Sequence, residues 1–174
     1  EIITHAVLGL PIAKPMRWGD GDASFVRPMH WLVVLFGDEV VPMELLGVKA
    51  SNTSTGHRYH HPEHVLVSSP RAYEVCLEEA GVMADFSVRR DAVRASVQAA
   101  VNELDADVVM PDALLDEVTS IVEWPSALRV DFDEAFLQVP SEVLIASMQQ
   151  HQKCFAVRDR DGALLPHFVT VSNI

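Results

Sequence analysis

The sequence predicts a mixed α+β fold, in which a largely antiparallel sheet sandwich packs against helices. Short apolar runs bounded by turn residues indicate strands, and longer segments with apolar residues at 3.6-residue spacing indicate helices. The two kinds of segment interleave without a strict βαβ repeat. With 174 residues, 49% of them hydrophobic, the chain can bury a sizeable core. We expect a single α+β domain over 1–174, with a possible subdivision into a strand-rich part, 1–68, and a helix–strand part, 69–174.

Helix signals occur in five segments. Pro11 stops the first helix, Gly81 closes the second, and Asp85 is a good N-cap for the third and longest. The last helix places His151 on its apolar face, so we expect His151 to point inward. The helices are predicted over residues 1–10, 69–80, 86–104, 111–118 and 140–151.

Strand signals begin with the apolar run 32–36, which the turn pair Gly37-Asp38 stops. This strand should form an antiparallel hairpin with 40–46. The polar segment 47–56 is predicted to be a loop, and 159–162 a turn between the last two strands. The remaining strands are predicted over residues 64–67, 120–123, 127–132, 154–158 and 164–172.

An unusual mixture of arginine, histidine and tryptophan precedes the first of these strands. Arg17 and Trp18, then Arg27, His30 and Trp31, lie within sixteen positions. Arginine and tryptophan combine stacking area with forked hydrogen bonding, which suits an anionic or aromatic partner. Two interpretations remain open: a binding rim at the mouth of the strand, or tryptophans in the core with the arginines paired to nearby aspartates.

Composition limits the class of protein. The net charge of −12 and pI near 4.9 mean that the chain as a whole repels a polyphosphate. Any RNA contact must therefore be local, and Arg17, Arg27, Lys49, His57 and Arg58 lie where few carboxylates intervene. No apolar stretch approaches the ~20 residues of a membrane helix and no signal peptide is evident, so we expect a cytoplasmic protein without a membrane partner.

Four histidines, at positions 57, 60, 61 and 64, suggest a zinc site at first sight. On an extended segment their side chains would alternate between two faces, which spoils a four-ligand cluster. No cysteine lies near them. We therefore expect no metal site.

A nucleophilic site built from Cys154 and His151 is also disfavoured. A reactive cysteine needs an electropositive and accessible surrounding, and only Lys153 supplies positive charge there. The other cysteine, Cys76, lies in a different segment without metal-type spacing. Free thiols without a chemical role are expected for both.

Blocks of sequence along nearly the whole chain resemble a known family. They are MRWG, FVRPMHWLVVLFGDEVVPMELLGVKA, TSTGHRY, DFSVRRDAV, EVTSIVEWP, VPSEVLIASMQQHQKCF and LLPHFVTVSNI. In this order they are similar to the β subunit of the tetrameric (α2β2) bacterial glycyl-tRNA synthetase, a class II aminoacyl-tRNA synthetase. The chain looks like a fragment from the N-terminal half of such a subunit.

The resemblance implies a division of labour between two subunits. The α subunit of that family activates glycine with ATP and Mg²⁺, and the β subunit engages tRNA(Gly). The chain contains no glycine-rich phosphate loop, so we expect no cofactor and no catalytic residue in it. A more distant resemblance to the B3/B4 module of the phenylalanyl-tRNA synthetase β subunit, which hydrolyses mischarged tRNA, implies a related fold.

Three functions follow as hypotheses: a tRNA-contacting and structural module, a proofreading hydrolase, or a scaffold that only docks the α subunit. Hydrolysis needs an assembled acid and base, which the sequence does not indicate. Glycine also gives little reason to proofread, since larger amino acids are easily excluded. We favour the first hypothesis, with tRNA-contact candidates Arg17, Arg27, His30, Lys49, His57, Arg58 and Lys153.

Overall fold

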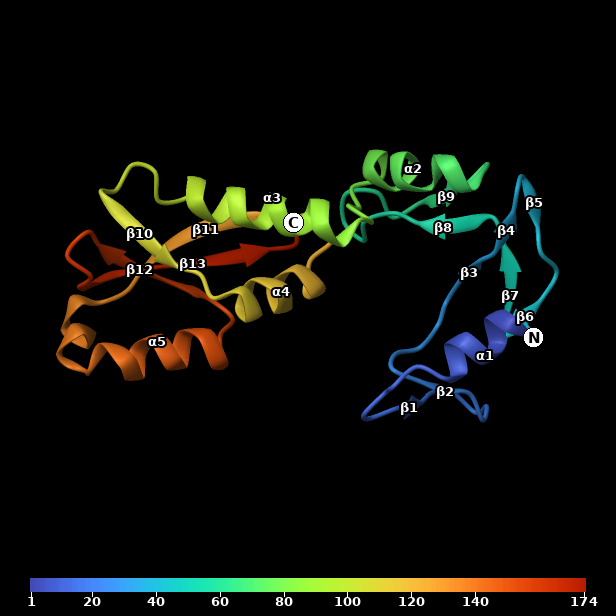
Figure 1. Cartoon of the computed structure of the whole chain (residues 1–174), viewed down its shortest axis with the longest axis horizontal. Helices are drawn as coiled ribbons and strands as arrows, with labels where there is room; N and C mark the ends of the chain where they lie inside the picture. The colour runs from blue at the N-terminus through green and yellow to red at the C-terminus, as the bar shows by residue number, and fades with distance from the viewer.

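The computed structural model describes all 174 residues and shows two lobes joined at a narrow waist (Figure 1). The first lobe contains α1, β1–β9 and α2, and the second contains α3, β10–β13, α4 and α5. Pairing is antiparallel everywhere except between β3 and β7. The predicted α+β class with mostly antiparallel sheets is confirmed. No helix is long and apolar enough to cross a bilayer.

The C-terminal lobe is built on one four-stranded sheet in the order β10-β12-β13-β11. Its strands are β10 (Ala106–Val109), β11 (Ser126–Asp131), β12 (Phe155–Asp159) and β13 (Leu164–Ser172). Its helices are α3 (Phe86–Ala99), α4 (Asp112–Ile121), the 3₁₀ helix η2 (Glu134–Gln138) and α5 (Ser141–Gln150).

Helices lie on both faces of this sheet. The main core forms where α3 and α4 meet one face, because Val93 and Val97 of α3 pack with Leu115 of α4 against Phe155 and Val169. Neighbouring side chains of a strand point to opposite faces. The other face therefore carries Phe168, which lines a small apolar hollow with residues of η2 and α5.

The N-terminal lobe consists of small sheets: β1–β2, β3–β7–β6, β4–β5 and β8–β9. Its strands are β1 (Met16–Arg17), β2 (Ser24–Phe25), β3 (Leu32–Val33), β4 (Leu35–Phe36), β5 (Glu39–Val40), β6 (Glu44–Leu45), β7 (Val48–Ser51), β8 (Thr53–Thr55) and β9 (His64–Leu66). Its helices are α1 (Ile2–Leu8), the 3₁₀ helix η1 (Pro70–Ala72) and α2 (Tyr73–Glu79).

This lobe buries little apolar surface. Before Val65, only Val34 and Leu45 are buried apolar side chains, and α1 has no buried residue. A second, small cluster joins Val65 of β9 to Leu77 of α2. The predicted subdivision separated 1–68 from 69–174, whereas this packing groups α2 with the strand that precedes it.

Most predicted elements are present. All five helices form, Asp85 Oδ1 accepts the N–H of Val88 at 2.8 Å as the cap of α3, and the β4–β5 hairpin pairs as expected. Gly81 has φ +73°, in keeping with the end of a helix.

Several predictions of local structure are wrong. The predicted loop 47–56 contains β7 and β8, the predicted strand 120–123 begins as the end of α4, and β10 was not predicted. The apolar run 32–36 divides at Val34 between two sheets. His151 is exposed, because it lies beyond the last turn of α5.

His57 holds the two lobes together at the waist. Its side chain is fully buried, and Nε2 donates a hydrogen bond to the backbone carbonyl of Asn173, 2.9 Å away. Its Nδ1 accepts the backbone N–H groups of Tyr59 and His60 at 3.3 and 3.2 Å. Those two donors fix the ring as the tautomer with the proton on Nε2.

Backbone groups complete the junction. The Asn173 side-chain oxygen accepts the N–H groups of Glu123 and Trp124 at 2.7 and 2.9 Å. The Glu123 carbonyl in turn accepts the N–H of Met83 at 3.0 Å. Arg89 of α3 donates to the carbonyls of Met83, Ala84 and Thr119. The segment between α2 and α3, which contains Met83 and Ala84 and connects the lobes, is therefore held against the C-terminal lobe by hydrogen bonds rather than by a large apolar interface.

Replacing His57 with Ala should lower the free energy of unfolding by roughly 2–4 kcal/mol, because it leaves a cavity and unpaired backbone groups. Chemical denaturation followed by circular dichroism measures this change. The matched control is His64→Ala, at an exposed position, which should stay within about 0.5 kcal/mol of wild type. Equal stability of the two variants would contradict the role of His57.

Candidate nucleic-acid interface

Cations without carboxylate partners gather in the N-terminal lobe. Arg27, Lys49 and Arg58 are exposed and form no ion pair within 4.0 Å, although Glu44 lies opposite Lys49 in the β6–β7 register. Arg17 reaches Asp22 only at 4.0 Å, with both side chains exposed. These side chains keep their charge available for an external anion.

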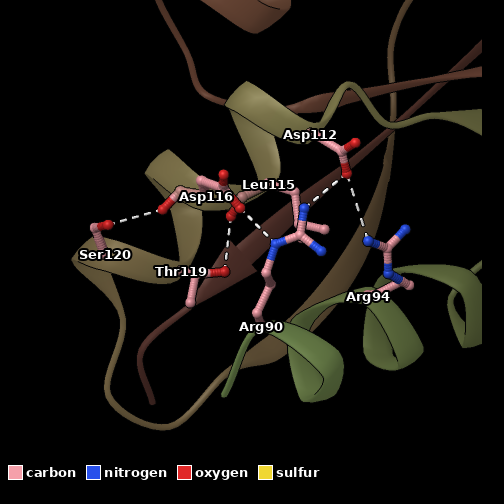
Figure 2. A network of polar contacts seen from close by, with 7 residues as sticks. All are labelled: Arg90, Arg94, Asp112, Leu115, Asp116, Thr119 and Ser120. Carbon is pink, nitrogen blue, oxygen red and sulfur yellow. Dashed lines mark hydrogen bonds and ion pairs between the residues drawn. The ribbon is translucent and has the colours of Figure 1, made fainter. Parts of the chain in front are cut away.

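Most cations of the C-terminal lobe are paired within it, although Arg129 of β11 is exposed without an ion pair. Figure 2 shows Arg90 of α3 between two carboxylates of α4: it lies 2.7 Å from Asp112 and also donates to Asp116. Arg94 reaches Asp112 from the next turn at 3.5 Å. These ion pairs join α3 to α4 across the surface of the lobe.

This pairing changes the acid strength of one carboxyl group. The hydrogen bond from Arg90 lowers the pKa of Asp112 below its ordinary value of 3.8, and the charge of the guanidinium adds to the effect. The same two aspartates raise the pKa of Arg90. Other cations of this lobe are also engaged, since Lys153 lies 2.8 Å from Glu117 and Arg160 pairs with Asp105.

The net charge is also distributed unevenly between the strand-rich part, 1–68, and the rest of the chain. Residues 1–68 contain five Lys and Arg against seven Asp and Glu, a net charge of −2. Residues 69–174 contain eight against eighteen, a net charge of −10. Nearly all of the net negative charge therefore lies in residues 69–174. Residues 1–68 repel a polyanion less than residues 69–174 do.

The candidate residues do not gather in one small patch. Arg17 lies in β1, Arg27 follows β2, Lys49 lies in β7, and Arg58 follows β8, so these cations extend along the N-terminal lobe toward the waist (Figure 1). Lys153 lies in the other lobe, with φ +55°. The first four share a lobe without converging on one point.

Two candidate histidines differ sharply in exposure. His30 is exposed, with its ring centroid 6.4 Å from that of Trp31. His57 is fully buried with both ring nitrogens engaged, so its ring presents no free atom to a ligand in this structure. Trp31 is 46% exposed, which disfavours the alternative of a core tryptophan at that position.

The other histidines do not assemble a metal centre. The segment from His57 to His61 is a turn rather than the extended segment considered in the sequence analysis, and the hydrogen bond from His61 N to His57 O at 2.9 Å closes it. The His57 and His60 rings stack at 4.6 Å, and His61 pairs with Glu63. No group of three or more metal-ligating side chains is positioned around a common point.

Cys154 has the surroundings of a structural thiol. It is buried, and burial raises the pKa of the thiol. Its Sγ donates to the carbonyl of Gln152 at 3.3 Å. A raised pKa disfavours the thiolate that a nucleophile requires.

Sequence reasoning missed the aromatic side chains next to the cations. Tyr59 and Tyr73 both line a cleft of about 650 Å³ at the waist, together with Arg58. Tyr73 fell within the predicted helix 69–80 and was not singled out. One signal was available, since the two residues are the only tyrosines in the chain and Tyr59 directly follows Arg58.

The Arg90 network yields a pH-dependent prediction. Because Asp112 has a lowered pKa in the folded state, its pairing stabilises the protein above pH 3.8 and is lost as pH falls through the lowered value. Arg90→Gln should therefore lower the Tm at pH 7, and the difference from wild type should shrink below pH 3.8. Thermal melts over a pH series measure it. Arg129→Gln, at an exposed arginine without an ion pair, is the control.

A comparison with known proteins matches the whole chain. A family model described as glycyl-tRNA synthetase beta subunit matches residues 1–174. Similar curated proteins are the glycine–tRNA ligase beta subunits of Pseudomonas syringae pv. tomato (48% identical over 173 residues), Hahella chejuensis (45% over 174) and Pseudomonas aeruginosa (47% over 173).

Each alignment covers 99% of this chain and 25% of the relative. The chain thus spans about a quarter of the length of the curated relatives that it matches. With a family model that matches every residue and relatives that are nearly half identical, the chain belongs to the glycyl-tRNA synthetase beta subunit family.

Proposed function

We propose that this chain is a non-catalytic module of a glycine–tRNA ligase β subunit, which contacts tRNA(Gly) through its N-terminal lobe in the cytoplasm. In this proposal a partner α subunit activates glycine with ATP and Mg²⁺, and the module supports the subsequent charging of the tRNA.

The unpaired cations of the N-terminal lobe carry this proposal. A protein with a net charge of −12 can bind RNA only where positive charge is not neutralised by its own carboxylates. Arg27, Lys49 and Arg58 meet this condition, whereas Arg90, Arg94 and Arg160 do not. Unpaired cations such as Arg27, Lys49 and Arg58 would release counterions from the RNA when they bind its phosphates.

Uncovered apolar side chains support a partner contact in addition. Helix α1 leaves Ile2 and Leu8 exposed, and Leu10 just beyond it is also exposed. Apolar surface of this kind is typical of protein contacts. Docking of the α subunit and contact with tRNA are therefore compatible roles for one lobe.

Charge reversal at Arg27 or Arg58, made in the complete ligase, should weaken tRNA binding and leave glycine activation nearly intact. A lost phosphate contact should lower the salt slope of binding by about one counterion and cost roughly 1–3 kcal/mol if the contact is bidentate. Titrations with tRNA(Gly) at several salt concentrations, beside glycine-dependent pyrophosphate exchange, measure both effects.

The matched control is Arg160→Glu, which changes the net charge equally but lies in the C-terminal lobe beside Asp105. It should bind tRNA like wild type. Variants at Arg27 and Arg58 with an unchanged affinity and salt slope would refute the tRNA contact, and a lowered Tm with all activities reduced together would indicate a structural role instead.

A proofreading hydrolase is the alternative, and no contact in the structure favours it. His57 cannot act as a general base while Nδ1 accepts two backbone N–H groups and Nε2 donates to Asn173. We expect deacylation of mischarged tRNA(Gly) by this chain to stay at the background rate, measured by release of the labelled amino acid. A rate above background that falls in His151→Ala would revive the alternative.

A further inference from the structure

Three exposed aromatic side chains border two hollows, one in the N-terminal lobe and one at the waist between the lobes. Tyr59 and Tyr73 line the waist cleft of about 650 Å³, and Tyr73 also lines a second hollow of about 430 Å³ together with Trp31. Tyr73 is the residue that the two linings share. Each volume lies in the range of small-ligand sites, roughly 300–1,000 Å³.

These rings are unusually open to solvent for their type. Trp31 is 46% exposed, Tyr59 68% and Tyr73 40%. Buried tyrosine and tryptophan usually serve a core, whereas exposed rings beside a hollow offer flat faces for stacking. No side-chain hydrogen bond within the chain engages either tyrosine hydroxyl, and the Tyr59 ring lies 6.2 Å from the His57 ring.

One free cation lies beside these rings, and a second is close to them in the sequence. The Arg58 guanidinium lies 5.8 Å from the Tyr59 ring centroid and lines the waist cleft. Arg71, in η1, is exposed, forms no ion pair and precedes Tyr73 by two residues, but it lines neither hollow. Arg89 also lines the cleft, but its donors are occupied by backbone carbonyls. Glu123 is the one carboxylate among the residues that line the cleft.

We propose that Trp31, Tyr73 and Tyr59 form a stacking track for unpaired RNA nucleotides, with Arg58 placed to neutralise a phosphate beside Tyr59. The proposal rests on the tRNA contact proposed above and names the part of the RNA that this lobe receives. Exposed rings interleaved with free arginines are the combination by which proteins hold single strands.

Unpaired nucleotides fit this surface better than duplex RNA does. An A-form helix keeps its bases stacked on each other, and proteins recognise it by backbone shape, so it presents no base face to Tyr59 or Tyr73. A protein segment would fit the apolar wall of the smaller hollow but gives no reason for Arg58, an arginine without a carboxylate partner beside Tyr59. The RNA strand accounts for both the rings and the charge.

The test uses the complete ligase, tRNA(Gly), a single-stranded oligoribonucleotide and a blunt RNA duplex. Tyr59→Ala and Tyr73→Ala should each weaken binding of tRNA and of the single strand by about five- to a hundredfold, without altering the salt slope. Tyr59→Phe and Tyr73→Phe should bind tRNA and the single strand like wild type, because the aromatic ring remains. Binding of the duplex should be unchanged in all four variants.

Phe36→Ala is the matched control, since Phe36 is 84% exposed in the same lobe and borders neither hollow. It should bind like wild type. If Tyr73→Ala destabilises the fold, Tyr59→Ala retains the test, because Tyr59 is the more exposed ring. Quenching of Trp31 fluorescence by the single strand gives an independent signal of stacking, with Trp31→Phe as the reference.

The outcomes separate this proposal from the function on which it rests. Alanine variants that bind like wild type, while reversal at Arg27 or Arg58 weakens tRNA binding, would overturn the stacking track and leave the tRNA contact standing. Alanine variants that impair association with the α subunit instead of RNA binding would overturn it in favour of a protein ligand. Loss of duplex binding to the same extent as single-strand binding would also refute it.

Discussion

The junction at His57 is the constraint on which the arrangement of the two lobes depends. The C-terminal lobe has a continuous apolar core and the N-terminal lobe has only small clusters, so few apolar contacts fix one against the other. A neutral imidazole with both nitrogens bonded to backbone groups supplies a directional link. The glycine before it is required by space, because a Cβ at Gly56 would lie 2.6 Å from the His61 carbonyl oxygen and 2.9 Å from Ala80.

The tetrapeptide Gly56-His57-Arg58-Tyr59 thus has two halves with different roles. Its first two residues are buried in the junction, and its last two are exposed beside the waist cleft. Because His57 is held rigidly, it fixes the direction in which the Arg58 and Tyr59 side chains project from the surface. Site residues held by a rigid neighbour lose less conformational entropy on binding, so the buried half supports whatever the exposed half contacts.

Local signals in the sequence predicted the parts of the fold that depend on local chemistry. Asp85 as a cap, Gly81 as a helix end and the turn before Gly162 all appear where they were expected, because each is decided within a few residues. Strands β7, β8 and β10 were missed, since short polar strands are fixed by remote partners rather than by their own periodicity.

The candidate site was predicted in the same uneven way. The free arginines were found from the scarcity of nearby carboxylates, which is a property of the sequence. The burial of His57 was not predicted, because its partner Asn173 lies 116 residues away and a polar tetrapeptide after a strand resembles a surface loop. Tyr73 was missed for a related reason, since its place between two hollows depends on how α2 packs on β9.

The unequal cores of the two lobes imply unequal local unfolding. Amide hydrogens of β12 and β13 lie in a sheet covered by helices, so they should exchange with solvent only through large cooperative openings. Those of β1 and β2 belong to an isolated two-stranded pair without buried side chains, and small fluctuations suffice to open it. The lobe with the free cations is therefore also the one that can adjust its backbone to the contour of a partner, while the helix-covered sheet remains a fixed frame.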